Sequence, residues 1–145
     1  MTRRARGLTG LRYGLLIGTL VGTLVGLAGC HADPSTSRGR AELFLDAYYV
    51  EIDLPRALEH TAGVAHAKVE QSIELTRNNA IDETTERPTV HYRFDAEHPD
   101  GAAAVNYVYL ADLTAAGESS QRKIVLTVRQ QDGDWRVTNF QEFTP

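Results

Sequence analysis

Residues 123–140 read KIVLTVRQQDGDWRVTNF, and they carry the clearest structural signal in the chain. Apolar and polar residues alternate on both sides of Asp132-Gly133. An Asp-Gly pair between two alternating runs predicts a two-residue hairpin turn. The runs 123–129 and 135–140 are therefore expected to be neighbouring antiparallel strands, which places a β-sheet at the end of the chain.

Two further strands are expected upstream of this hairpin. The period of two over residues 89–94 puts Val90, Tyr92 and Phe94 on one face. Residues 103–113 carry apolar side chains on both faces, which is typical of a central strand. His98-Pro99-Asp100-Gly101 predicts the turn between them, and residues 115–121 are expected to be a loop. The sheet should therefore have four strands.

The segment before the strands has helical periodicity instead. One apolar stripe consists of Ala41, Phe44, Leu45, Tyr48 and Ile52. Asp53 is expected to cap a second, short helix with Pro55 in its first turn, ending near His60. Thr61 is expected to cap a third helix, which ends near 77–79. Three helices followed by four strands predict an α+β domain, with N-terminal helices packed on one face of a curved antiparallel β-sheet.

The aromatic first helix and the closing hairpin carry a family resemblance. Residues 44–49 read FLDAYY, and residues 132–137 read DGDWRV. Over residues 41–143 the chain resembles the nuclear transport factor 2-like superfamily, also called polyketide-cyclase-like. The resemblance implies a cone-like fold around a pocket and, in many members, dimers through the open sheet face. Some members are enzymes with a buried Asp–His pair, and others only bind ligands or partners. A strand that full members place between the helices and the long sheet is not evident, so a shallow pocket or none is expected.

The first 29 residues predict an export signal. Arginines open the chain, an apolar stretch punctuated by glycines follows, and residues 27–30 read Leu-Ala-Gly-Cys. This ending resembles the lipobox of bacterial lipoproteins, which implies that Cys30 becomes the lipid-modified N-terminus. Residues 30–40 are then a flexible tether, and residues 41–145 a single domain. An uncleaved transmembrane helix is the alternative, and five glycines between Gly14 and Gly29 disfavour it.

The predicted location and the net charge of the exported part limit the classes of partner that are expected. His31 follows the cysteine where inner-membrane lipoproteins of enterobacteria carry Asp, so the resemblance favours the outer membrane, facing the periplasm, over the inner membrane. Cys30 is the only cysteine, which excludes an intrachain disulfide. The exported part carries 11 basic and 19 acidic residues, a net charge of −8 with neutral histidines. This balance argues against a nucleic-acid partner.

Few residues are candidates for chemistry. Asp46 and His91 are the catalytic candidates, because an imidazole base needs an orienting carboxylate. His91 shares its strand face with Arg93, however, which indicates solvent exposure. The candidates for ligand contact are Tyr48, Tyr107 and Tyr109, with an ordinary core role as the alternative.

A metal site is not expected. His66, Glu70 and Glu74 are spaced by four and share a helical face, but a solvated helix shows the same spacing and no partner motif accompanies them. The sequence also has no glycine-rich phosphate loop and no nucleophile elbow. No cofactor is therefore expected.

Three functions remain open. The favoured one is a lipid-anchored cell-envelope lipoprotein with a non-catalytic ligand- or protein-binding domain. The second is a small hydrolase, isomerase or cyclase-like enzyme that uses the cone pocket, and the third is a subunit of an envelope assembly. The expected partners are the membrane through the lipid anchor, a protein or small hydrophobic ligand, and a second copy of the chain.

Overall fold

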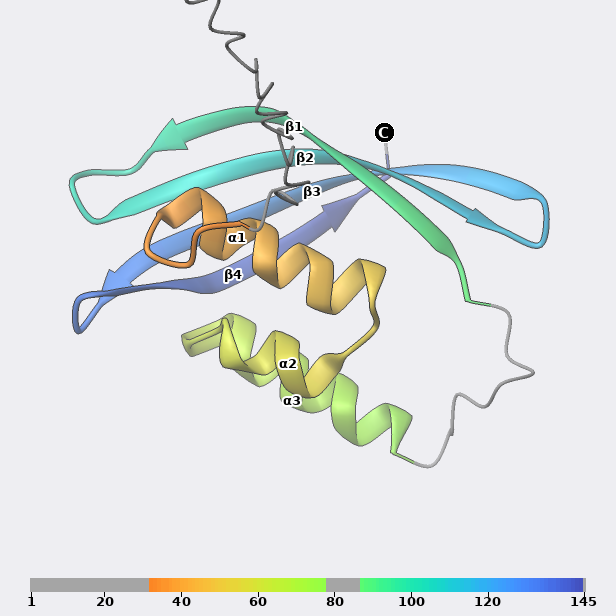
Figure 1. Ribbon diagram of the computed structural model, residues 1–145, viewed down its shortest axis with the longest axis horizontal. Coiled ribbons are helices and arrows are strands. Elements are labelled where there is room, and N and C mark those ends of the chain that lie inside the picture. Colours follow the sequence, from red (N-terminus) through yellow and green to blue (C-terminus); the bar gives the residue numbers. More distant parts are fainter. Residues whose placement is uncertain (1–31, 78–86, 145) are drawn as a thin grey trace, which may run out of the picture.

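The computed structural model describes residues 32–77 and 87–144, which form helices on one side of a curved sheet (Figure 1). The helical elements are α1 (Ser37–Leu45), the π-helix η1 (Asp46–Val50), α2 (Leu54–Glu59) and α3 (Gly63–Thr76). The strands are β1 (Thr89–Pro99), β2 (Ala104–Ala115), β3 (Glu118–Gln131) and β4 (Asp134–Phe143). The sheet is antiparallel in the order β1-β2-β3-β4. The predicted α+β architecture is confirmed.

Two-residue turns with positive φ join β2 to β3 and β3 to β4. Asp132 and Gly133 have φ values of 51° and 89°, which confirms the hairpin predicted from the Asp-Gly pair. Ala116 and Gly117 have φ values of 51° and 81°. The loop predicted over residues 115–121 is therefore wrong, because β3 already begins at Glu118. Its first residues are polar because this end of the sheet is exposed, so they lack the alternation that marks a half-buried strand.

Strand β1 is also longer than predicted. It continues to Pro99, and its register shifts between Phe94 and Ala96 at a bulge. His98 and Pro99 lie opposite Asn106 and Val105, so the turn begins only at Asp100. Proline is tolerated there because it ends an edge strand, where a missing N–H does not break the sheet.

The short helix α2 has the predicted cap. The Asp53 carboxylate accepts a hydrogen bond from the Arg56 amide at 3.1 Å, and Pro55 lies in the first turn. Thr61 does not cap α3, contrary to the prediction. Its hydroxyl donates to the Leu58 carbonyl at 2.8 Å, and its backbone forms a parallel bridge with Val137 of β4. The bridge holds the chain in an extended conformation at Thr61, so α3 begins only at Gly63.

Helix α1 starts earlier than expected. It begins at Ser37, whereas the sequence predicted a flexible tether as far as Arg40 and a helix from Ala41. Thr36 is the N-cap, and its side chain accepts a hydrogen bond from the Gly39 amide at 3.0 Å. The sequence did not predict this first helical turn because it contains Gly39, and glycine is a poor helix former. Residues 37–40 therefore belong to the folded domain.

Some predictions fall outside the described residues. These are the export signal, Cys30, His31 and the Asn78-Asn79 end of the third helix. Helix α3 ends at Thr76 with Arg77 as its C-cap, close to the predicted position. Within residues 32–77 and 87–144, no helix is long and apolar enough to cross a membrane.

The core lies between the helices and the concave face of the sheet. Its largest fully buried side chains are Phe44, Leu45, Val69, Tyr109, Ile124, Leu126, Val128 and Val137. Val90, Tyr92 and Phe94 point inward as their alternation predicted, and Val90 is part of the buried core. The interior between the helices and the sheet is thus occupied by aliphatic and aromatic side chains.

Candidate functional site

Helix α1 and its π-helical extension direct a polar face at the tyrosines of the sheet. Arg38, Glu42 and Asp46 follow one another at intervals of four and so share one face of the helix. The Arg38 Nε atom donates to a Glu42 carboxylate oxygen at 2.9 Å, and the Arg38 guanidinium lies 4.1 Å from the centre of the Phe94 ring. One turn further on, the Tyr92 hydroxyl donates to the Asp46 carboxylate at 2.7 Å.

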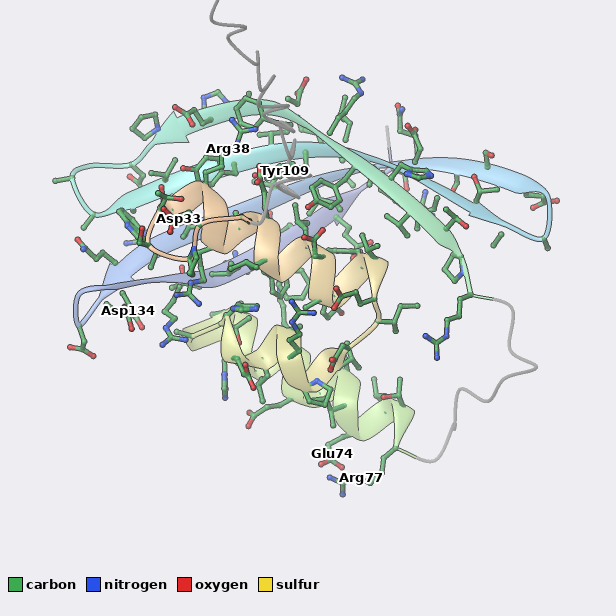
Figure 2. The ribbon with its side chains drawn as sticks, in the orientation of Figure 1. Asp33, Arg38, Glu74, Arg77, Tyr109 and Asp134 are labelled. Carbon is green, nitrogen blue, oxygen red and sulfur yellow. The ribbon has the colours of Figure 1, made fainter. Side chains whose placement is uncertain are left out.

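Tyr109 lies at the centre of this region with no exposed surface, and Figure 2 shows it across from Arg38. Its ring contacts those of Tyr92, Phe94 and Tyr107, with centroid distances of 5.7, 5.9 and 6.4 Å. Its hydroxyl has no hydrogen-bond partner among the described residues. Arg38 interacts with it electrostatically, but the geometry is not that of a hydrogen bond. Burial and then the Glu42 charge raise the pKa of Tyr109, so the phenol stays neutral.

Tyr107, the neighbouring ligand candidate, is tied to the start of α1. Its hydroxyl lies 2.7 Å from the Ser37 hydroxyl, and its side chain is buried. Tyr107 and Tyr109 therefore both occupy the interior. They act there as core residues with polar ends.

Asp46 and His91, the catalytic candidates, are not brought together. The Asp46 carboxylate bonds to Tyr92, which points toward the helices. His91 precedes Tyr92 on the same strand, so it points to the opposite face of the sheet, where it is exposed and lies opposite Asp112. The sequence could have identified Tyr92 as the partner of Asp46, because the alternation over residues 89–94 already directed Tyr92 inward.

Tyr48, the third ligand candidate, lines an open groove of about 330 Å³ at the end of η1. The other lining residues are Tyr49, Ile52, Leu54, Ser72, Thr76, Pro88, Val90 and Leu113. The Tyr48 ring packs on Phe44 and Phe140, with centroid distances of 5.3 and 5.1 Å. Its hydroxyl lies 3.3 Å from that of Ser72. The groove is therefore mainly apolar, and four of its lining residues, Tyr48, Tyr49, Ser72 and Thr76, also carry hydroxyl groups.

An irregular backbone shapes this groove. Residues 46–50 form a single π-helical turn, a feature that is often found at functional sites. Ile52 follows with a φ of 55°, a conformation that costs an L-residue about 1–2 kcal/mol and is uncommon for a β-branched side chain. Neither feature is predicted from the sequence, in which Tyr48 and Ile52 fall on one regular helical stripe.

Tyr49 forms one wall of the groove. Its hydroxyl donates to the Glu142 carboxylate at 2.8 Å, which links η1 to the end of β4. Burial, followed by the Glu142 charge, raises the pKa of Tyr49. The phenol therefore stays protonated as a hydrogen-bond donor, and this wall is fixed in place.

The residues with metal-like spacing are engaged elsewhere. His66 Nδ1 lies 3.2 Å from the Thr61 hydroxyl, and its Nε2 lies 3.6 Å from a Glu70 carboxylate oxygen. Glu74 instead accepts a bond from Arg77 at 2.6 Å, and Figure 2 shows this pair together at the end of α3. Over the part of the chain that the structure describes, no three His, Cys, Asp or Glu side chains are grouped so that they could hold a metal ion.

Comparison with known proteins identifies the fold. No family model and no curated protein matches the sequence. Among solved structures, the chain is similar to an NTF2-like protein of unknown function from Pseudomonas putida KT2440, with 14% identity and a TM-score of 0.57. That alignment covers 77% of this chain and 86% of the other.

Two further structures are similar. One is a chain named Rd1NTF2_05 with five substitutions, at 11% identity and a TM-score of 0.53, over 75% of this chain and 97% of the other. The second is an M. tuberculosis LEH-like epoxide hydrolase at 16% identity, with a TM-score of 0.48, over 75% of this chain and 82% of the other. The likenesses to the Pseudomonas putida protein and to Rd1NTF2_05 show that the domain has an NTF2-like fold, as the sequence resemblance implied.

Proposed function

We propose that this chain is a lipid-anchored protein of the bacterial cell envelope whose NTF2-like domain binds an apolar partner without catalysing a reaction. The anchor is the lipid on Cys30, and the sequence Leu27-Ala28-Gly29-Cys30 behind a basic start and an apolar stretch supports it. His31 after the cysteine supports the outer membrane, facing the periplasm, as the location.

The filled interior of the domain is the observation that favours a binding function over a catalytic one. Tyr109 has no exposed surface where a fold of this shape would otherwise enclose a pocket. The Asp46 carboxylate is bonded to Tyr92 and lies on the other side of the sheet from His91. A reaction needs a base, an orienting group and room for substrate at one place, and Asp46 and His91 do not meet these requirements together among the described residues.

The groove at η1 is the binding surface in this proposal. It is mainly apolar, and a strained residue, Ile52, helps to form it. Strain of this kind persists where the surrounding structure enforces it, often at binding sites. The occupant is a small hydrophobic ligand or an apolar side chain of a protein partner.

The anchor is tested by expressing the full chain with and without Cys30→Ser. The wild type should fractionate with membranes and gain the mass of a lipid-modified N-terminus that starts at Cys30. The variant should lack the lipid and retain its uncleaved leader. Finding the same uncleaved chain in both proteins would overturn the lipoprotein assignment.

The groove is tested with Nile red and the purified exported domain. Thr76→Trp places an indole at the rim of the groove, whereas Gln71→Trp places one on an exposed part of the same helix outside it. Dye affinity should fall about tenfold or more in Thr76→Trp and stay unchanged in Gln71→Trp. An equal affinity in both variants would place the apolar binding surface elsewhere.

A further inference from the structure

The domain begins with a closed turn that packs on helix α1. The Asp33 carbonyl accepts from the Thr36 amide at 3.1 Å, and the Asp33 carboxylate accepts from the Ser35 amide and hydroxyl at 2.9 and 2.7 Å. Thr36 then caps the helix through the Gly39 amide. The chain is therefore fixed from Asp33 onward.

Gly39 allows this turn to lie directly against the helix. It is buried, and a Cβ atom at this position would lie 1.8 Å from the Asp33 carbonyl oxygen. Arg40 adds a bond from its Nη2 atom to the Pro34 carbonyl at 3.2 Å. Residues 33–40 thus form one unit, which we call the N-terminal clasp.

The clasp lies at one end of the sheet. Ser37, at the start of α1, bonds to Tyr107 of β2, whereas Asp46 bonds to Tyr92, which lies opposite Ala111 of β2. Helix α1 therefore runs along β2 from residue 107 toward residue 111. Its N-terminus points to the β1–β2 turn, as Figure 1 shows.

The groove lies toward the other end. Leu113 of β2 and Val90 of β1, which is paired with it, are among its lining residues. Strand β2 runs from Ala104 at the clasp end to Ala115 beyond the groove. At about 3.4 Å per residue, its 12 residues separate the two ends by roughly 40 Å.

We propose that the N-terminal clasp holds the β1–β2 turn end of the domain against the membrane, so that the groove faces away from it. The inference rests on the proposed lipid on Cys30. Once the leader is removed, only Cys30, His31 and Ala32 lie between the lipid and the clasp. Three residues span at most about 11 Å. The predicted tether of 11 residues would reach roughly 40 Å. The clasp therefore leaves too little free chain for the domain to rotate relative to the membrane. The β1–β2 turn end of the domain then lies against the lipid headgroups.

The test places one probe at each end of β2 in the full-length, lipid-modified protein. Ala102→Cys and Ala115→Cys are matched, because both alanines are exposed and lie in or beside turns at opposite ends of the sheet. The lipid occupies the Cys30 thiol, so each variant has one thiol that reacts with a maleimide fluorophore. The proteins are reconstituted in phosphatidylethanolamine–phosphatidylglycerol vesicles that carry a headgroup nitroxide quencher. We expect at least about threefold stronger quenching at residue 102 than at residue 115.

Two changes should remove the difference. A ten-residue Gly-Ser insertion between Ala32 and Asp33 lengthens the tether without altering the clasp, and Gly39→Ala forces the turn off the helix. Equal quenching at both ends before either change, in a vesicle-bound protein with one reactive thiol, would overturn the inference and leave the lipid anchor standing. Two reactive thiols and no vesicle binding would instead overturn the proposed function and this inference with it.

Discussion

Arg40 donates a hydrogen bond from its guanidinium to the Nδ1 atom of His60 at 3.2 Å. A guanidinium has no acceptor, so His60 Nδ1 must be unprotonated and the imidazole neutral. Burial, followed by the charges of Arg40 and Arg56, lowers the pKa of His60. His60 is the C-cap of α2, where a cationic ring would interact favourably with the last carbonyls, but these arginines, from α1 and α2, disfavour that form.

Acid should therefore destabilise the domain through His60. The unfolded chain takes up a proton near the ordinary histidine pKa of about 6.5, whereas the folded chain does so only at lower pH. The free energy of unfolding should fall as the pH drops below about 6.5, until the folded-state pKa is passed. Urea titrations at several pH values should show a shallower dependence over this window in His60→Asn. His91→Asn, which replaces an exposed histidine of β1, is the control substitution.

Tyr109→Phe should stabilise the protein. Its hydroxyl is buried without a hydrogen bond among the described residues, so only the electrostatic interaction with Arg38 offsets its removal from water on folding. Deleting it should raise the free energy of unfolding by about 1 kcal/mol, measured by chemical denaturation. A loss of similar size would show that the hydroxyl is bonded in solution, to water or to a ligand.

Tyr92→Phe should have the opposite effect. It removes a 2.7 Å bond to the Asp46 carboxylate and leaves that half-buried group without its donor. A loss of about 1–2 kcal/mol in the free energy of unfolding is expected. Tyr107→Phe is the comparison, because it removes a bond between two neutral hydroxyls and should cost less. The prediction fails if the order of the two losses is reversed.

Ile52→Gly should be better tolerated than Val50→Gly. Glycine relieves the positive φ at residue 52, which offsets the loss of the half-buried side chain. Val50 ends the π-helix and is 42% exposed, so its replacement mainly loosens a helical backbone, at a cost of about 1 kcal/mol. Thermal unfolding of the two variants compares these costs. A larger loss for Ile52→Gly would show that side-chain packing outweighs backbone strain there.

Local signals made much of the fold predictable. Asp132-Gly133 has one favoured turn between alternating strands, and Asp53 before Pro55 is a strong helix start. The errors arose where a distant contact decides the conformation. Thr61 resembles an N-cap, but its pairing with Val137 holds it extended. Gly39 resembles a tether residue, but its lack of a side chain lets the Asp33 turn pack on the helix.

The candidate site was less predictable than the fold. The spacing of Asp46 and Tyr48 on the first helix was visible, but the π-turn that separates the polar face of Arg38, Glu42 and Asp46 from the groove was not. The inward direction of Tyr92 was available from its alternation. Its bond to Asp46 depends on how the helix crosses the sheet, which no local pattern specifies.

The bridge between Thr61 and Val137 also affects how copies of the chain can associate. It covers part of the outer edge of β4, where an unpaired strand could recruit a strand from another molecule. At the opposite edge, β1 is interrupted by a bulge and exposes the ionisable residues His91, Arg93, Asp95 and Glu97. Both features oppose continuation of the sheet from one molecule to the next. A homodimer of this domain would therefore join through faces of the sheet and not through its edges, which limits growth into fibrils.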